Sequence, residues 1–157
     1  MAKPGETPNI LIVEARFYED IADELVKGAT RELETQGAKF ERLSVPGAFE
    51  IPAAIAMAVR SMDFAGARQR FDGYIALGCV IRGETTHYDY VCAESARKLQ
   101  DLACQYSLAM GYGILTCENE EQARVRASVA GKNKGRDVAA ACLRMLELKR
   151  HFQLYPR

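Results

Sequence analysis

The residues most able to do chemistry lie in GCVIRGETTHYDYV, residues 78–91, where an apolar run meets a turn rich in polar side chains. His87, one of two histidines in the chain, can take up and return a proton near neutral pH. Glu84, Thr85 and Thr86 precede a predicted helix, whose free N–H groups and dipole favour an anion. The segment predicts an anion site beside a proton carrier, with a plain threonine N-cap and a surface histidine as the alternatives.

A second segment, VPGAFEIP at residues 45–52, places a ring and a carboxylate at the start of another predicted helix. Glu50 can accept hydrogen bonds from ligand hydroxyls, and the small residue Ala48 lets a ligand approach the backbone beside Phe49. Phe17 follows the first apolar run and can cover a planar ligand. The alternatives are that Glu50 only complements the helix dipole and that Phe17 closes the core.

Basic side chains near the end of the chain are a further candidate for anion binding. Guanidinium and ammonium groups beside a glycine-containing break can hold a phosphate, and a solvated basic face is the alternative. The sequence contains no glycine-rich fingerprint of a dinucleotide or P-loop site, and no metal-binding motif. The basic residues are Arg124, Arg126, Lys132, Lys134 and Arg136.

Strand-like and helix-like patterns alternate along the chain and must position these residues. Short apolar runs predict four strands, at residues 9–13, 40–45, 73–81 and 112–116. Helical spacing and capping signals predict five helices, at about residues 19–36, 49–61, 88–106, 119–130 and 137–151. Right-handed crossovers then give a three-layer α/β/α sandwich with a four-stranded parallel sheet. Ligands bind beyond the carboxyl ends of such strands, and the candidate residues lie in the loops there.

Composition limits the classes of protein to which the chain can belong. Its 157 residues, 48% of them hydrophobic, suit one domain over residues 1–157, with residues 1–8 as a flexible tail. The 21 basic and 21 acidic residues balance, so no overall field attracts nucleic acid or an anionic membrane. No apolar stretch reaches the length of a membrane span. Five widely spaced cysteines favour buried, reduced thiols in the cytoplasm over disulfides or a zinc site.

Four motifs, in order and in spacing, closely resemble the lumazine synthase family over about residues 9–152: VPGAFEIP, GCVIRGETTHYDYV, GYGILTCENEEQA and KNKG. The resemblance implies a flavodoxin-like fold and an enzyme of the penultimate step of riboflavin biosynthesis. In that step 5-amino-6-ribitylamino-pyrimidinedione condenses with 3,4-dihydroxy-2-butanone 4-phosphate. The products are 6,7-dimethyl-8-ribityllumazine and inorganic phosphate, and the resemblance implies no metal and no organic cofactor.

The resemblance also implies roles for single residues. Phe17 would stack on the pyrimidine ring, and Glu50 would bind hydroxyls of the ribityl chain. His87 would carry protons during imine formation and phosphate elimination. The remaining contacts to the substrate ring and chain are implied for Ala48, Phe49, Val80, Ile81 and Tyr112. The phosphate site is implied for Thr85, Thr86, Arg126 and Lys134, with Glu84 beside them.

Members of the family are at least pentameric, and each of their sites straddles two subunits. The resemblance therefore implies that Tyr112, Arg126 and Lys134 reach the site from a neighbouring copy. Some relatives stop at pentamers and others build shells of sixty subunits. Pro4 and Pro8 are poorly suited to adding an extra strand to a neighbour's sheet, which favours a free homopentamer.

The chain departs from the family pattern at three positions, Tyr18, Glu84 and Lys132. Glu84 matters most, because a carboxylate near a phosphate is repulsive unless it points away or pairs with Arg82. These departures affect affinity and not the type of reaction. Three rival classes remain: a flavin or lumazine carrier without turnover, a protein whose assembly is its function, and a flavodoxin-like signalling domain.

Overall fold

The computed structural model describes residues 7–64, 66 and 71–154. Most of the predicted tail, residues 1–6, and part of the segment between the predicted helix at 49–61 and the predicted strand at 73–81 lie outside these described residues. The strands are β1 (Asn9–Ala15), β2 (Lys39–Val45), β3 (Gly73–Ile81) and β4 (Ala109–Cys117). The helices are α1 (Glu19–Thr35), the 3₁₀ turn η1 (Ala48–Glu50), α2 (Ile51–Ser61), α3 (His87–Tyr106), α4 (Glu120–Ala127) and α5 (Lys134–His151).

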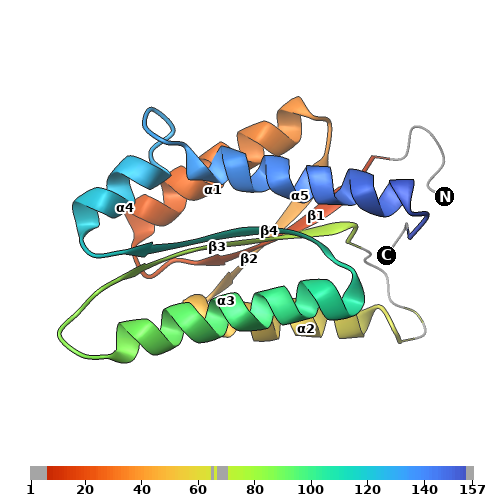
Figure 1. The fold of residues 1–157 in the computed structure, drawn as a ribbon. Helices are drawn as coiled ribbons and strands as arrows, with labels where there is room; N and C mark the ends of the chain where they lie inside the picture. The colour runs from red at the N-terminus through yellow and green to blue at the C-terminus, as the bar shows by residue number, and fades with distance from the viewer. Residues whose placement is uncertain (1–6, 65, 67–70, 155–157) are drawn as a thin grey trace.

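All four strands run parallel, in the order β2-β1-β3-β4. Helices α1, α4 and α5 cover one face of the sheet, and α2 and α3 cover the other (Figure 1). The predicted three-layer α/β/α sandwich is therefore confirmed. The carboxyl ends of the strands meet at one edge, on the left in Figure 1, where the loops into α1 and α3 also lie.

Alternation along β1 explains why the sheet separates two hydrophobic clusters. Ile10 and Ile12 face the layer of α1, α4 and α5, whereas Leu11 and Val13 face α2 and α3. All four side chains are fully buried, as expected for a central strand covered on both faces. The edge strand β2 is mostly exposed, so its position depends on few contacts besides its pairing with β1.

Three predicted boundaries are wrong by about three residues. Strand β4 begins at Ala109 and not at residue 112, α4 ends at Ala127 and not at 130, and α5 begins at Lys134 and not at 137. A break does separate the two helices, but it lies at residues 128–133, and Gly135 belongs to the first turn of α5. A Cβ atom built on Gly135 would lie 2.1 Å from the carbonyl oxygen of Leu25 on α1. The glycine therefore allows two helices to touch and does not interrupt one.

Local capping signals are confirmed where the sequence is most explicit. Asn119 is the N-cap of α4, and its Oδ1 accepts a hydrogen bond from the backbone N–H of Gln122 at 2.9 Å. The side chain of Gln122 in turn accepts from the backbone N–H of Glu118, also at 2.9 Å. This reciprocal pair fixes where the chain leaves β4, as a capping box does.

The cysteines bear out the prediction of buried thiols only in part. All five are free; Cys79, Cys117 and Cys142 are buried, Cys92 is partly buried and Cys104 is exposed. Within the part of the chain that the structure describes, no helix is both long enough and apolar enough to cross a bilayer.

The contact between α1 and α5 generates a stability prediction. Gly135→Ala forces a methyl group against the backbone of α1 and should destabilise the fold by roughly 1–3 kcal/mol. For a chain of this size, each kcal/mol lowers the thermal midpoint by about 2–4 °C at fixed protein concentration. Gly83→Ala is the control, since a Cβ atom there meets nothing within 4 Å. An equal midpoint for the two variants would contradict the close contact.

Candidate active site

Three loops at the carboxyl edge of the sheet enclose one pocket with a volume of about 300 Å³. The first follows β1, the second follows β2 and includes η1, and the third joins the end of β3 to α3. Seven residues predicted from the sequence line this pocket: Phe17, Ala48, Phe49, Glu50, Val80, Ile81 and His87. The fold therefore brings together the predicted ring, carboxylate and proton carrier.

The two phenylalanines of the pocket are exposed although they are large and apolar. Phe17 is 73% exposed and Phe49 is 57% exposed in the subunit. The ring of Phe17 meets the ring of Tyr18 edge to face, with centroids 4.9 Å apart. Because its faces are not packed into the core, Phe17 is not a core lid, and it can stack on a planar ligand.

Glu50 lies at the end of η1, directly before α2. Its carboxylate approaches Gly47, where a Cβ atom would lie 3.2 Å from Oε2 of Glu50. Glu50 is the N-cap residue of α2, yet its side chain makes no capping hydrogen bond in the described helix. The carboxylate is exposed and lines the pocket, so it can accept hydrogen bonds from ligand hydroxyls.

The turn between β3 and α3 is anchored at its first residue, Arg82. Its backbone N–H donates to the carbonyl of Cys117 at 3.0 Å, and its Nε donates to Glu118 at 2.7 Å. The guanidinium also reaches Asp89, at 3.3 Å, and lies 4.3 Å from the ring centroid of Tyr88. Arg82 thus ties the start of the turn to the end of β4 and to the first turn of α3.

Of the two arrangements that would keep Glu84 from repelling a phosphate, pairing with Arg82 is not the one that the structure shows. Arg82 pairs instead with Glu118, in the loop that follows β4, and with Asp89 in the first turn of α3. Glu84 is exposed at the tip of the turn. Its carboxylate can turn toward water, which reduces its repulsion of an anion bound at the helix start.

The two threonines of this turn keep their hydroxyl groups available. Thr86 is the N-cap of α3, but its side chain makes no capping hydrogen bond within that helix. The Oγ1 of Thr85 accepts from the backbone N–H of His87 only at a long distance, 3.4 Å. Neither hydroxyl makes a short capping hydrogen bond, so the plain threonine N-cap does not account for these two exposed residues. The start of α3 offers N–H groups and two hydroxyls to an anion.

The other predicted site residues do not line this pocket. Arg126, on α4, donates from Nη1 to the carbonyl of Gln122 at 3.0 Å. Lys134 forms an ion pair with Asp137 at 3.4 Å. Tyr112, which is 42% exposed, borders a different cavity of about 800 Å³. Within one subunit the candidate anion site therefore lacks the predicted cations among its lining residues.

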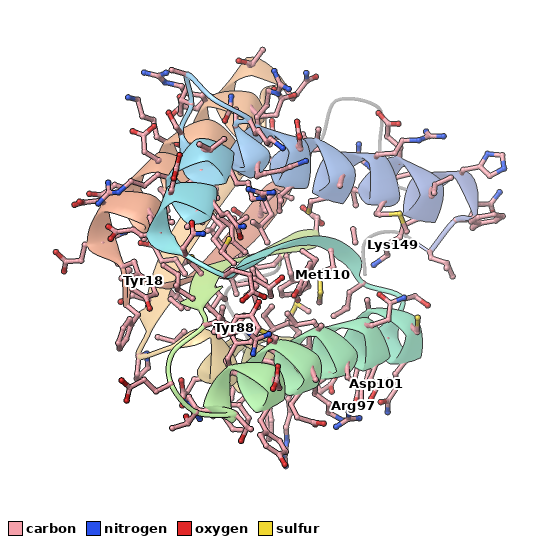
Figure 2. All side chains as sticks on the ribbon, turned by 60° about the vertical axis from the view of Figure 1, so that its left-hand side comes forward. Tyr18, Tyr88, Arg97, Asp101, Met110 and Lys149 are labelled. Carbon is pink, nitrogen blue, oxygen red and sulfur yellow. The ribbon has the colours of Figure 1, made fainter. Side chains whose placement is uncertain are left out.

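The larger cavity is an apolar groove beside the free edge of β4, between α3 and α5. Met110 and Lys149 lie in this space, whereas Arg97 and Asp101 lie on the side of α3 turned away from the sheet (Figure 2). The hydroxyl of Tyr112 is desolvated and lies near Cys92 and Tyr88, which raises its pKa. A phenol in this setting stays protonated at neutral pH.

Sequence reasoning assigned no place in the pocket to three residues that line it: Tyr18, Cys79 and Val91. Burial, together with the neighbouring thiol of Cys117, raises the pKa of Cys79 to about 12. Cys79 is therefore a neutral pocket wall and not a nucleophile. Its only sequence signal is its position directly before Val80 at the end of an apolar strand.

The described residues 7–64, 66 and 71–154 contain no group of three or more histidine, cysteine, aspartate or glutamate side chains placed to hold a metal ion. The polar side chains that line the pocket include a carboxylate and an imidazole, and the two hydroxyl-bearing threonines directly precede that imidazole in the chain. They suit a planar, hydroxylated molecule beside an anion.

A parallel sheet in the order β2-β1-β3-β4, with a pocket over its carboxyl edge, defines a flavodoxin-like α/β protein with a small-molecule site. A family model described as 6,7-dimethyl-8-ribityllumazine synthase matches residues 7–150. The chain belongs to this family, and it is accordingly an enzyme, a transferase.

Curated relatives support this membership over nearly the whole chain. The 6,7-dimethyl-8-ribityllumazine synthase 1 of Rhizobium meliloti is 56% identical over 141 residues, covering 90% of this chain and 91% of the relative. The synthase of Agrobacterium fabrum is 54% identical over 143 residues, covering 91% and 95% respectively. That of Bartonella tribocorum is 51% identical over 152 residues and covers 97% of each chain.

The state of Cys79 generates a chemical prediction. With a pKa of about 12, only about one thiol in 10⁴ is ionised at pH 8, compared with roughly a quarter for an ordinary cysteine. Iodoacetamide should therefore modify Cys79 at least about a hundredfold more slowly in the native protein than in urea. Mass spectrometry of the labelled peptide measures both rates. Rapid labelling of Cys79 in the native protein would contradict a protonated pocket thiol.

Proposed function

We propose that the chain condenses 5-amino-6-ribitylamino-pyrimidinedione with 3,4-dihydroxy-2-butanone 4-phosphate to form 6,7-dimethyl-8-ribityllumazine and inorganic phosphate, in the penultimate step of riboflavin biosynthesis in the cytoplasm. The observation that supports this most directly is the single pocket holding Phe17, Glu50 and His87, in a chain of the family that carries this product's name. Phe17 stacks on the pyrimidine ring and Glu50 binds the hydroxyls of the ribityl chain. Ala48, Phe49, Val80 and Ile81 complete the walls.

The phosphate end of the second substrate lies at the start of α3. The hydroxyls of Thr85 and Thr86 and the N–H groups of the first turn bind its oxygens, with Glu84 beside them. His87, the first residue of α3, passes protons during imine formation and phosphate elimination. Donors fixed in advance stabilise the charge that accumulates as phosphate leaves.

The cations that complete this site come from a neighbouring copy of the chain. Arg126, Lys134 and Tyr112 do not line the pocket of their own subunit, and a basic group beside the phosphate is needed to balance its charge. The exposed rings of Phe17 and Phe49 leave apolar surface at the pocket rim, which contact with a neighbour would cover. A cyclic homopentamer satisfies these needs, because each site then lies between two subunits.

The direct test of the function is to mix the two substrates with the purified protein. Lumazine absorbance and inorganic phosphate should appear together and in equal amounts. A flavin or lumazine carrier would bind the product without forming it, and an assembly protein would do neither. Phosphate release without lumazine, or no release at all, would contradict the proposed reaction.

Single substitutions distinguish proton transfer from charge stabilisation. Holding both substrates in position supplies most of the acceleration, because effective molarities of oriented groups are large. His87→Ala should therefore reduce kcat by only about 10- to 100-fold. Arg126→Ala should reduce it further, since the leaving phosphate loses its fixed positive charge. Steady-state kinetics measures both, and a wild-type rate for Arg126→Ala would contradict its place in the phosphate site.

Mixed oligomers test whether two subunits share a site. His87→Ala and Arg126→Ala chains, unfolded together and refolded as a mixture, should recover about a quarter of the wild-type activity, because random mixing pairs the two intact surfaces at that frequency. Each variant refolded alone is the control, and light scattering should give a pentamer in all samples. Activity of the mixture equal to the mean of the two variants would show that each site lies within one subunit, and a megadalton particle would contradict the pentamer.

A further inference from the structure

An ion network behind the pocket is unusual because its central group is buried. Glu14 lies near the end of β1, on the face toward α1, where the preceding residues of that face are Ile10 and Ile12. It is only 3% exposed. A buried carboxylate is costly unless its oxygens are hydrogen-bonded by positive groups, so its partners must be held in a defined geometry.

Two arginines satisfy this carboxylate. Arg42, on the neighbouring strand β2, donates from Nε to Oε2 and from Nη2 to Oε1, both at 2.9 Å. Arg16 donates from Nη1 to Oε1 at 2.8 Å and from Nη2 to Asp23 on α1. Burial by itself raises the pKa of Glu14, but the hydrogen bonds and positive charges of Arg42 and Arg16 together outweigh it and keep the pKa below its usual value.

The network connects the two loops that form the ring-binding side of the pocket. Arg16 directly precedes Phe17, and its guanidinium is held on both sides, by Glu14 and by Asp23. Arg42 belongs to the strand that leads into the loop of Phe49, so the pair with Glu14 fixes that strand against β1. The distance between the two loops is therefore set by side chains that do not line the pocket themselves.

Phe17 depends on such support because its own side chain makes few contacts. It is 73% exposed, and its one described ring partner is its neighbour Tyr18. Tyr18 packs against the core cluster, and Arg16 is held by the ion network. The backbone of Phe17 is thus fixed from both sides while its ring stays free to receive a ligand.

We propose that Glu14 and Arg42 are positioning residues for the pyrimidine half of the reaction, acting through Arg16 and the two loops that carry Phe17 and Phe49. This inference rests on the proposed function and adds to it the residues that hold its ring site. Neither residue touches substrate. Their removal should displace the rings while leaving the phosphate turn, which Arg82 anchors separately, in place.

The two substrates allow this role to be separated from a general loss of structure. In Arg42→Met, the KM of the ribitylamino-pyrimidinedione should rise roughly tenfold, less than the roughly hundredfold that a misplacement of about 1 Å can cost. The KM of the butanone phosphate and kcat should stay within about twofold of wild type, as expected when binding energy of one substrate is lost uniformly. Arg42→Lys keeps the charge but cannot form both hydrogen bonds to Glu14. Its KM for the ribitylamino-pyrimidinedione should therefore lie between those of the wild type and Arg42→Met.

Replacing Arg42 alone leaves the buried charge of Glu14 without its main partner, which can unfold the protein. A double variant separates this loss of stability from the proposed positioning role. Glu14→Leu with Arg42→Leu removes both partners and should keep a thermal midpoint near that of the wild type, because apolar pairs can replace buried ion pairs. It should nevertheless keep the raised KM for the pyrimidine. Arg144→Met is the matched control, since Arg144 pairs with Glu147 at 2.8 Å on the exposed surface of α5.

Wild-type KM values for both substrates in the double variant would overturn the proposal and leave the network a purely stabilising one. Equal rises in both KM values would also overturn it. Riboflavin, a fluorescent ring with a ribityl chain, gives an independent readout by quenching on binding, and its Kd should rise about as much as the pyrimidine KM. If the wild-type protein forms no lumazine, the proposed function fails, and the riboflavin titrations alone still decide whether the network positions the ring site.

Discussion

Four parallel strands end at the same edge of the sheet, and this constraint decides where the functional side chains of one subunit can lie. The order β2-β1-β3-β4 makes the loops after the first three strands neighbours, so Phe17, Glu50 and His87 share one pocket. Strand β4 lies at the far edge, and the helix that follows it carries Arg126 outside that pocket. One copy of the chain therefore brings Phe17, Glu50 and His87 together, and in the proposed function the cations come from a second copy.

The pocket must keep its aromatic rings exposed and yet hold them in place. Its aromatic rings are exposed, which makes them useful to a planar ligand but leaves them without packing to hold them. At Phe17 the structure resolves this conflict by fixing the residues on either side, Arg16 and Tyr18, and leaving the ring free. The buried carboxylate of Glu14 with Arg42 serves the ring half, and Arg82 with Glu118 serves the anion half. Both supports are ion pairs between neighbouring strands or the loops that follow them: one joins β1 to β2, and the other joins the loops after β3 and β4.

The sequence predicted the layers, the sheet and most of the pocket because each depends on local patterns. Apolar runs and helical spacing identify strands and helices, and the topology then brings their loops together. The misplaced start of α5 has a nonlocal cause, since Gly135 resembles a break until its contact with Leu25 is known. The ion network was missed for the same reason. Glu14 is a lone charge in an apolar strand, and its partner Arg42 lies on another strand, 28 residues away in sequence.

In the proposed function, the phosphate of the second substrate binds between two subunits. A crystal structure of the oligomer soaked in phosphate or in a substrate mimic tests it most directly. We expect an anion held by the hydroxyls of Thr85 and Thr86 in one copy and by the guanidinium of Arg126 from the next copy. An anion absent from the start of α3, with Arg126 facing bulk water in every copy, would contradict it.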